Sequence, residues 1–474
     1  MQQDTPLLKL PSEVLHQILT HLECQTLISL GRTCRQLHTA ALTDLLWANL
    51  LRREIPAIDF PESDPFPSSS YRDLYITHHP YWFVPKYKIW ISNDPHIGRI
   101  MLCRFDPRRG CIEGYRLLAE RGSSQSLLWP YNRSVVIHTF EPKVKPWLDD
   151  PILTLAHNIG PFNSRQGWWE GEIKMSVGRP GHNTSASFFL SRNVPDDPRM
   201  DVWPPRTIPT MPRVRAASID KFQGKGHKPQ SYSQISETTF RMRHWSQFSS
   251  GMSRYGVRIG EEVSTWSTID PSLYRPTPDK PFQGIFVGDY AGHGCEFLLV
   301  MHTDQAPPQP PPPVRSPFTD AQREFIDLDL EGFSDGDDND GLLEPSEPEP
   351  PSRTRQQFPA DAATHYDDRV FSGALEAVKL TGDPNVPRGE HTFIADDIGP
   401  KGLVRIATEH PFAGARVVRS RGHVAARGFV HDVFIPSQLL IVNQNRLAQY
   451  WVPFGHISFY QRVDIDELMR SVFH

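Results

Sequence analysis

Four residues in two short turns have side chains suited to binding a ligand through hydrogen bonds. Tyr290 and His293 lie in the run Asp-Tyr-Ala-Gly-His-Gly, and Asp383 and Asn385 belong to the turn Gly-Asp-Pro-Asn. A phenol, an imidazole, a carboxylate and an amide can each make hydrogen bonds with a bound molecule. Structural roles compete with this interpretation, because Tyr290 can face a core and Asp383 can accept bonds from its own turn. We expect a binding site formed by these residues.

The spacing of the other reactive residues argues against catalysis. The histidines are scattered without metal-ligand spacing, and no serine or cysteine has a nucleophile-elbow setting. The glycines of Ala291–Gly294 lack the Gly-Lys-Ser/Thr ending of a phosphate loop, and their positive φ suits a tight hairpin instead. We therefore expect no catalytic residue, no cofactor and no metal.

Charge and cysteine content bound the class of protein. Five scattered cysteines favour a reducing compartment over a disulfide framework. Residues 320–350 hold twelve acidic side chains against one basic one, so the net charge of −5 leaves the rest of the chain mildly basic. No aromatic and basic platform for nucleic acid accompanies this charge. Because the sequence shows neither a leader nor a long apolar run, we expect a cytoplasmic or nuclear protein without a membrane partner.

The elements that must position the binding residues begin with a leucine-rich stretch, Leu8–Glu54. Leu15, Ile18, Leu19 and Leu22 fall at helical spacing after Pro11. Two further apolar stripes follow, so the spacing predicts three short helices. Fewer than fifty residues rarely bury enough apolar surface alone. The module is therefore either a cap on the rest of this chain or a surface for another protein's helices.

The residues of this stretch resemble a known protein-binding motif. The run Leu-Pro-x-Glu-Val-Leu-x-x-Ile-Leu, followed by the Leu-x-x-Leu, Cys-Arg and Trp47 positions, resembles an F-box, by which substrate receptors of cullin–RING ubiquitin ligases bind the Skp1 adaptor. The resemblance implies that Skp1 is a partner and, through it, a cullin–RING ligase. It assigns Skp1 binding to Leu10, Pro11, Val14, Leu15, Ile18, Leu22, Leu27, Leu30 and Cys34.

The remainder has the pattern of an antiparallel β-protein. Short extended runs with hairpin turns recur, among them residues 99–105 with 111–117, and a final strand at 457–463 whose side chains alternate. The pattern points to an antiparallel barrel or sandwich. We predict an α+β fold in which a helical F-box precedes this β-domain, which the resemblance described next implies to be a β-barrel. The predicted divisions are residues 1–54 for the F-box, 55–75 for a connector, 76–463 for the barrel and 464–474 for a short helix. Disordered insertions are expected at about 192–258 and 305–366.

A second resemblance concerns this β-region. The runs GIFVGDYAGHGCEFLLV, KLTGDPNVPRGEHTF and WVPFGHISFYQRV are similar to the substrate-recognition region of the F-box only protein 31 family, whose fold is a lipocalin-like β-barrel. The resemblance implies a protein substrate held through a short degron, in that family a carboxyl-terminal end. It places Cys103 and Cys111 at two ligands of the zinc site of animal relatives. No later Cys and His pair completes that set.

We therefore predict a non-catalytic substrate-recognition subunit of a Skp1–cullin–F-box E3 ubiquitin ligase. Tyr290, His293, Asp383 and Asn385 are its candidate substrate-binding residues. One alternative is a lipocalin-like protein that holds a small molecule and uses the F-box as a tether. Another is a hydrolase, which predicts a reactive nucleophile.

Overall fold

The computed structural model describes residues 6–56, 65, 67–156, 173–175, 184–194, 201–210, 212–215, 228–248, 257–290, 293–305 and 368–473. Its helices are α1 (Ser12–Leu19), α2 (Cys24–Gly31), α3 (Arg35–Ala41), α4 (Asp44–Glu54), α5 (Tyr71–His78), α6 (Phe83–Tyr87), α8 (Pro271–Tyr274) and α10 (Ile465–Phe473), with 3-10 turns at Pro6–Lys9, Tyr232–Gln234, Asp368–Val370 and Val452–Phe454. Within the described residues, none of these helices has the length and apolar character needed to cross a membrane.

The strands fall into two large sheets and one short pair. The first half of the chain supplies β1 (Ile89–Ser92), β2 (Ile100–Asp106), β3 (Cys111–Glu120), β4 (Ser126–Trp129), β5 (Asn132–His138), β6 (Lys143–Pro146), β7 (Leu153–Leu155), β8 (Ile173–Met175), β9 (Thr184–Arg192), β10 (Val202–Trp203), β11 (Val214–Arg215), β12 (Ile235–Phe248) and β13 (Val257–Ser267). The second half supplies β14 (Gly284–Asp289), β15 (Cys295–Thr303), β16 (Ala374–Lys379), β17 (His391–Ala395), β18 (Leu403–Ile406), β19 (Arg416–Ala426), β20 (Val430–Asn443), β21 (Arg446–Trp451) and β22 (His456–Arg462).

A closed barrel is formed by the second half of the chain. In the described residues, β14, β15, β16, β17, β19, β20, β21 and β22 each pair antiparallel with the next, and β22 returns to pair with β14. Side chains alternate between its two faces. Phe286, Phe393 and Tyr460 belong to the apolar cluster inside, whereas Ile457 and Phe459 belong to the cluster outside. The predicted fold class, helices followed by a large antiparallel β-barrel, is confirmed.

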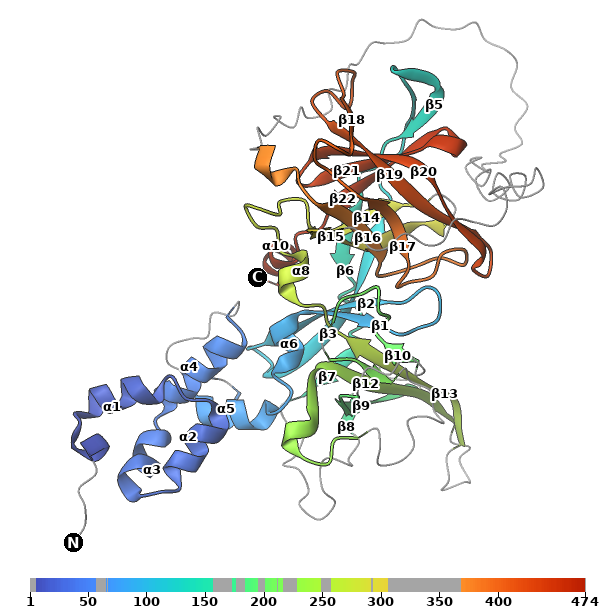
Figure 1. The fold of residues 1–474 in the computed structure, drawn as a ribbon. Helices are drawn as coiled ribbons and strands as arrows, with labels where there is room; N and C mark the ends of the chain where they lie inside the picture. The colour runs from blue at the N-terminus through green and yellow to red at the C-terminus, as the bar shows by residue number, and fades with distance from the viewer. Residues whose placement is uncertain are drawn as a thin grey trace, which may run out of the picture.

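The other large sheet lies between the helices and the barrel, as Figure 1 shows. Its strand order is β6-β3-β2-β1-β13-β12-β9-β8, with β7 beside β3. On β1, Ile89 and Ile91 join the apolar cluster on the outside of the barrel, and Trp90 joins the cluster that contains helices α1 to α6. On the outer side of the barrel, β5 pairs parallel with β22 and carries β4 with it.

Three predicted boundaries are wrong. The barrel does not begin at residue 76, because α5, α6 and a separate sheet precede it. The connector does not extend to residue 75, since α5 begins at Tyr71, where Ser70 accepts a hydrogen bond from the Asp73 amide. The insertion predicted at 192–258 contains strand β12, in which arginines alternate with the buried Phe240 and Met242. The polar composition of this segment led to the incorrect prediction of a loop. The insertion at 305–366 lies almost wholly outside the described residues.

The helical module also differs from the predicted three helices. The second apolar stripe is divided between α2 and α3, because Cys34 has extended backbone angles and the Thr33 hydroxyl donates to the Leu30 carbonyl. The predicted hairpin β2–β3 is confirmed, with Phe105 opposite Ile112. The last helix, α10, is preceded by Asp464, which accepts a hydrogen bond from the Glu467 amide at 2.9 Å.

Gly288 lies inside the barrel where a side chain has no room. A Cβ atom there would lie 2.5 Å from the Tyr460 ring, whereas one at Gly284 on the same strand would lie 3.3 Å from its nearest neighbour. Overpacking of this kind costs about 1–3 kcal/mol. We expect Gly288→Ala to lower the free energy of unfolding in urea by that amount, and Gly284→Ala to lower it less. Equal losses in the two variants would contradict this packing.

Candidate functional site

A cluster of buried charges lies at one end of the barrel. The ammonium of Lys379, at the end of β16, is 2.8 Å from a carboxyl oxygen of Glu296 and 2.6 Å from one of Asp383. All three side chains are at most 5% exposed. Charges are costly to bury unless they are paired, so each member of this cluster depends on the others.

Asp383 is held by its own turn as well as by Lys379. Its Oδ1 accepts hydrogen bonds from the Asn385 amide at 2.6 Å and the Val386 amide at 2.7 Å. Burial acts to raise the pKa of Asp383, but the Lys379 ammonium and these hydrogen bonds outweigh it and lower the pKa to about 2. Asp383 is therefore a carboxylate under physiological conditions, with much of its accepting capacity already used.

Glu296 has the opposite protonation behaviour. Burial raises the pKa of its carboxyl well above the ordinary value, and the negative charge of Asp383 acts in the same direction against the pull of Lys379. Two carboxyls beside one ammonium do not both ionise readily. Protonation of Glu296 would leave the cluster with one positive and one negative charge, and the hydrogen bond between Glu296 and Asp383 acts in that direction.

Aromatic and hydroxyl groups surround the charges. The Lys379 ammonium lies 4.3 Å from the centre of the Tyr290 ring, and the Tyr290 hydroxyl is 2.7 Å from the Thr392 hydroxyl. A line of hydrogen bonds continues inside the barrel from the Tyr460 hydroxyl to Gln449 and from Gln449 to Ser437. Burial raises the pKa of the Tyr290 hydroxyl well above its ordinary value, so it remains protonated.

The structure brings together most of the residues predicted to bind a substrate. Tyr290 and Asp383 both contact Lys379, and the backbone of Asn385 supports Asp383. His293 is exposed at the β14–β15 tip, where its amide donates to the Tyr290 carbonyl at 3.0 Å. The sequence reasoning missed Lys379 and Glu296. Their signal is a charged residue flanked by apolar ones, in Ala-Val-Lys-Leu and Cys-Glu-Phe-Leu.

The two cysteines considered for zinc do not face a shared site. On the β2–β3 hairpin, Cys103 pairs with Gly114 and Cys111 with Asp106. Side chains alternate along each strand, so this register puts Cys103 and Cys111 on opposite faces of the hairpin. Burial raises the pKa of the Cys103 thiol well above its ordinary value and that of Cys111 to about 12. No group of three potential metal ligands occurs among the residues that the structure describes.

A second candidate surface is on the helical module. Its inner residues, including Leu15, Leu19, Leu27 and Trp47, share an apolar cluster with α5 and the sheet. This chain itself therefore covers that face, as the cap interpretation expected. An outer row remains: Val14 is 41% exposed, Ile18 40% and Leu45 58%.

The nine residues assigned to Skp1 binding accordingly divide into three groups. Leu15 and Leu27 are buried core; Pro11, Val14 and Ile18 are exposed; Leu10, Leu22, Leu30 and Cys34 are half-buried. The assignment missed Ile28, Leu42 and Leu45, which are also exposed apolar residues of this module. Exposed apolar groups gathered on one small module are typical of an interaction surface.

Two known family models match separate parts of the chain. Residues 7–53 match the F-box-like family model, and residues 266–467 match the model of the cyclin D1 binding domain. No curated protein matches the chain. The chain therefore contains an F-box-like domain in α1 to α4. The second match spans α8, the whole closed barrel and the start of α10, so it includes the buried charge cluster.

The low pKa of Asp383 predicts a specific acid dependence. An aspartate in an unfolded chain has a pKa of about 3.9. A carboxyl whose pKa is lower when folded stabilises the fold at neutral pH and loses that contribution as the pH falls from about 4 to about 2. We expect the wild type to exceed Asp383→Asn in unfolding free energy at pH 5, and this gap to shrink by about 2 kcal/mol at pH 2.

Urea unfolding of both proteins at the two pH values measures the gap. Asp396→Asn is the control, since Asp396 pairs with Arg421 at 3.0 Å but is 44% exposed. A gap for Asp383→Asn that does not depend on pH would contradict the ionised cluster.

Proposed function

We propose that this chain is the substrate-recognition subunit of a Skp1–cullin–F-box E3 ubiquitin ligase. The observation that carries the proposal is the outer apolar row of the F-box-like domain, formed by Val14, Ile18 and Leu45. The chain covers the inner face of this module but leaves that row in solvent. An adaptor such as Skp1, docking through the row, would bring the cullin and its catalytic partners to the receptor.

In this proposal the chain itself performs no bond chemistry. Its contribution is proximity, since it holds a protein substrate while other subunits transfer ubiquitin. The barrel end that carries Tyr290, His293, Asp383 and Asn385 binds a short degron of the substrate, such as its carboxyl-terminal end. The backbone N–H groups or a terminal amide of the degron would find acceptors there. Cyclin D1 is the first substrate to test, because the family model that matches the barrel carries its name.

The small-molecule alternative has less support. Eight-stranded barrels either fill with their own side chains or hold one small ligand. Here Phe286, Phe393 and Tyr460, each at most 1% exposed, pack in the interior with other apolar side chains. This arrangement favours recognition at the end of the barrel over storage inside it.

The adaptor interface predicts a loss of binding when charge enters the apolar row. We expect Val14→Glu with Ile18→Glu to reduce co-purification of Skp1 and cullin at least tenfold, because both carboxylates would be desolvated in the interface. Pull-down from cell extract followed by immunoblotting measures this. Leu128→Glu is the control, since Leu128 is 64% exposed on β4, which lies on the outer side of the barrel away from the F-box-like domain. Undiminished recovery of Skp1 with the double variant would contradict the assignment.

Substrate recognition predicts a different loss, with the adaptor retained. We expect Asn385→Ala and His293→Ala each to lower capture of purified cyclin D1 severalfold, since a hydrogen bond contributes about 1 kcal/mol. His293 is exposed, whereas Asn385 is half-buried with its Oδ1 enclosed, so thermal denaturation of each variant checks that the fold persists. Asn445→Ala is the matched control, because Asn445 is an exposed turn residue at the opposite end of the barrel. Equal capture by all variants would contradict a degron site at this end.

A further inference from the structure

The turn that carries Asp383 is attached to the other sheet. This turn, residues 380–390, joins β16 to β17 in the barrel, and residues 93–99 join β1 to β2 in the sheet. The amide of Gly382 donates to the Ile97 carbonyl at 2.7 Å, and the amide of Arg388 donates to the His96 carbonyl at 2.9 Å. Two backbone hydrogen bonds therefore connect the two loops.

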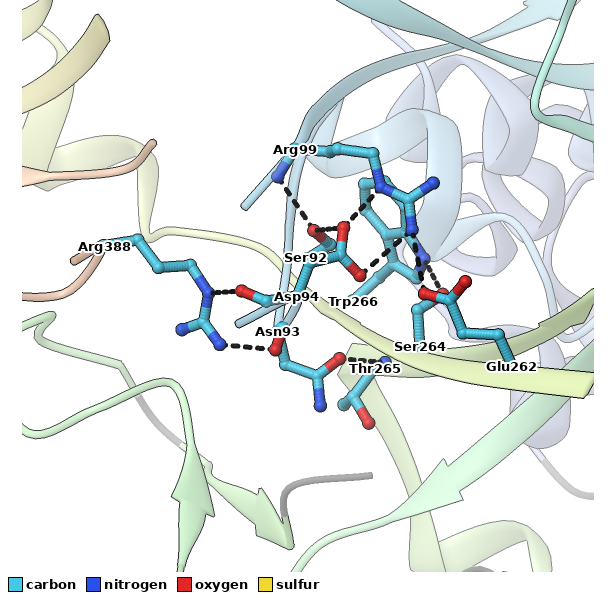
Figure 2. A network of polar contacts seen from close by, with 9 residues as sticks. All are labelled: Ser92, Asn93, Asp94, Arg99, Glu262, Ser264, Thr265, Trp266 and Arg388. Atoms are coloured by element: carbon cyan, nitrogen blue, oxygen red, sulfur yellow. Dashed lines mark hydrogen bonds and ion pairs between the residues drawn. The ribbon is translucent and has the colours of Figure 1, made fainter. Parts of the chain in front are cut away.

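Arg388 reinforces this connection through its side chain. Its Nε donates to the Asp94 carbonyl and its Nη2 to the Asn93 carbonyl, so the guanidinium spans two successive peptide groups, as Figure 2 shows. Its other contact is the Trp203 ring, whose centre is 3.9 Å from the guanidinium carbon. Burial lowers the pKa of Arg388 to about 10, which leaves it charged at neutral pH. A rigid planar fork suits this role better than a lysine ammonium would.

The 93–99 loop is itself firmly held by the sheet. The side chain of Asn93 accepts from the Thr265 amide at 2.7 Å, and the Asn93 amide donates to the Thr265 carbonyl at 2.9 Å. The carboxylate of Asp94 accepts from the Ser92 hydroxyl at 2.7 Å and from Arg99 Nη2 at 3.0 Å. Figure 2 shows these contacts continuing to Glu262 and Trp266 on β13. Arg388 thus binds to a loop with little freedom to move.

Glycines allow the two loops to touch. A Cβ atom on Gly98 would lie 2.6 Å from Cδ of Arg388, and one on Gly382 would lie 2.6 Å from the His96 carbonyl oxygen. Gly98 also has a φ of +70°, which favours glycine. The approach is therefore built into the backbone of both loops.

The same turn sets the position of Lys379. The Lys379 amide donates to the Glu390 carbonyl at 2.8 Å, and the Gly389 amide donates to the Lys379 carbonyl at 2.7 Å. Arg388 directly precedes Gly389, whose amide makes the second of these hydrogen bonds to the backbone of Lys379. If Arg388 moved, the backbone of the turn would move with it. Lys379 at one side of the turn and Asp383 at the other would then change position.

We propose that Arg388 is a positioning residue for the barrel-end binding site, because it fixes the turn that carries Asp383 to the 93–99 loop of the neighbouring sheet. The part of this inference that concerns binding rests on the proposed function. Arg388 does not contact the substrate in this proposal. It makes substrate capture by the barrel depend on a sheet that lies outside the barrel.

The test compares full-length wild type with Arg388→Ala, Arg388→Lys and Arg416→Ala. Arg416 is a matched control, because its Nε donates to the Ile398 carbonyl at 2.7 Å and its guanidinium lies 4.6 Å from the Phe371 ring, at the opposite end of the barrel. Hydrogen–deuterium exchange of the Asn385 and Val386 amides reports the position of Asp383 without any ligand. Capture of purified cyclin D1 reports binding, and thermal denaturation reports overall stability.

We expect the two amides to exchange at least tenfold faster in Arg388→Ala, less so in Arg388→Lys, and at the wild-type rate in Arg416→Ala even if its melting temperature falls equally. Capture of cyclin D1 should fall at least fivefold in Arg388→Ala only. Unchanged exchange in Arg388→Ala, or capture equal to that of a wild type that binds, would overturn the inference. A wild type that captures no cyclin D1 counts against the proposed substrate, while the exchange rates still decide whether Arg388 positions the turn.

Discussion

The structure depends on one strand pair that is buried on both faces. Along β1 and β2, alternate side chains belong to different cores: Ile89, Ile91, Ile100 and Leu102 pack toward the barrel, and Trp90, Met101 and Cys103 pack toward the helices. A sheet usually needs only one covered face. Because both faces are covered here, the helical module and the barrel are built on the same layer.

This shared layer bears on how a receptor of this kind would work. The helical module packs on α5, where the Trp47 and Tyr75 rings lie 5.5 Å apart. The α5–α6 region is joined to the sheet by Trp82 against Phe105 at 5.2 Å and by the buried His78 ring, which lies 2.9 Å from the Gly110 carbonyl. The barrel is joined to the sheet by its outer apolar cluster and by the Arg388 contacts. The shared packed layer would hold an adaptor on the helices and a substrate on the barrel at a fixed separation.

Local patterns allowed much of the fold to be predicted from the sequence. Helical spacing located the apolar stripes near Leu15 and Leu27, and alternation located the final strand, with Ile457 and Tyr460 on opposite faces as predicted. The division into two sheets could not be predicted, because pairings such as β1 with β13 join residues far apart in the sequence. Strand β12 was missed because its arginines alternate with its apolar residues and give the segment the composition of a loop.

Only part of the candidate site could be predicted from the sequence. The composition of the turn identified Asp383 and Asn385, because the residues that form such a turn are adjacent in the sequence. Lys379 and Glu296 gain their meaning only from the pairing of β15 with β16, which brings them within 2.8 Å. Arg388 appeared in the sequence as one more charged residue of a turn. Only the tertiary structure shows that its partners are carbonyl groups nearly three hundred residues earlier.

The closure of the barrel has a consequence for biosynthesis. Strand β14 needs β22 as its neighbour, yet more than 150 residues separate Phe286 from Arg462, which it faces. A ribosome would therefore have to translate the chain as far as β22 before the barrel could close, and distant pairings of this type form slowly. Until then the apolar inner faces of the earlier strands would be open to chaperones or to aggregation. A premature stop codon before β22 would yield an unclosed sheet rather than a shortened receptor.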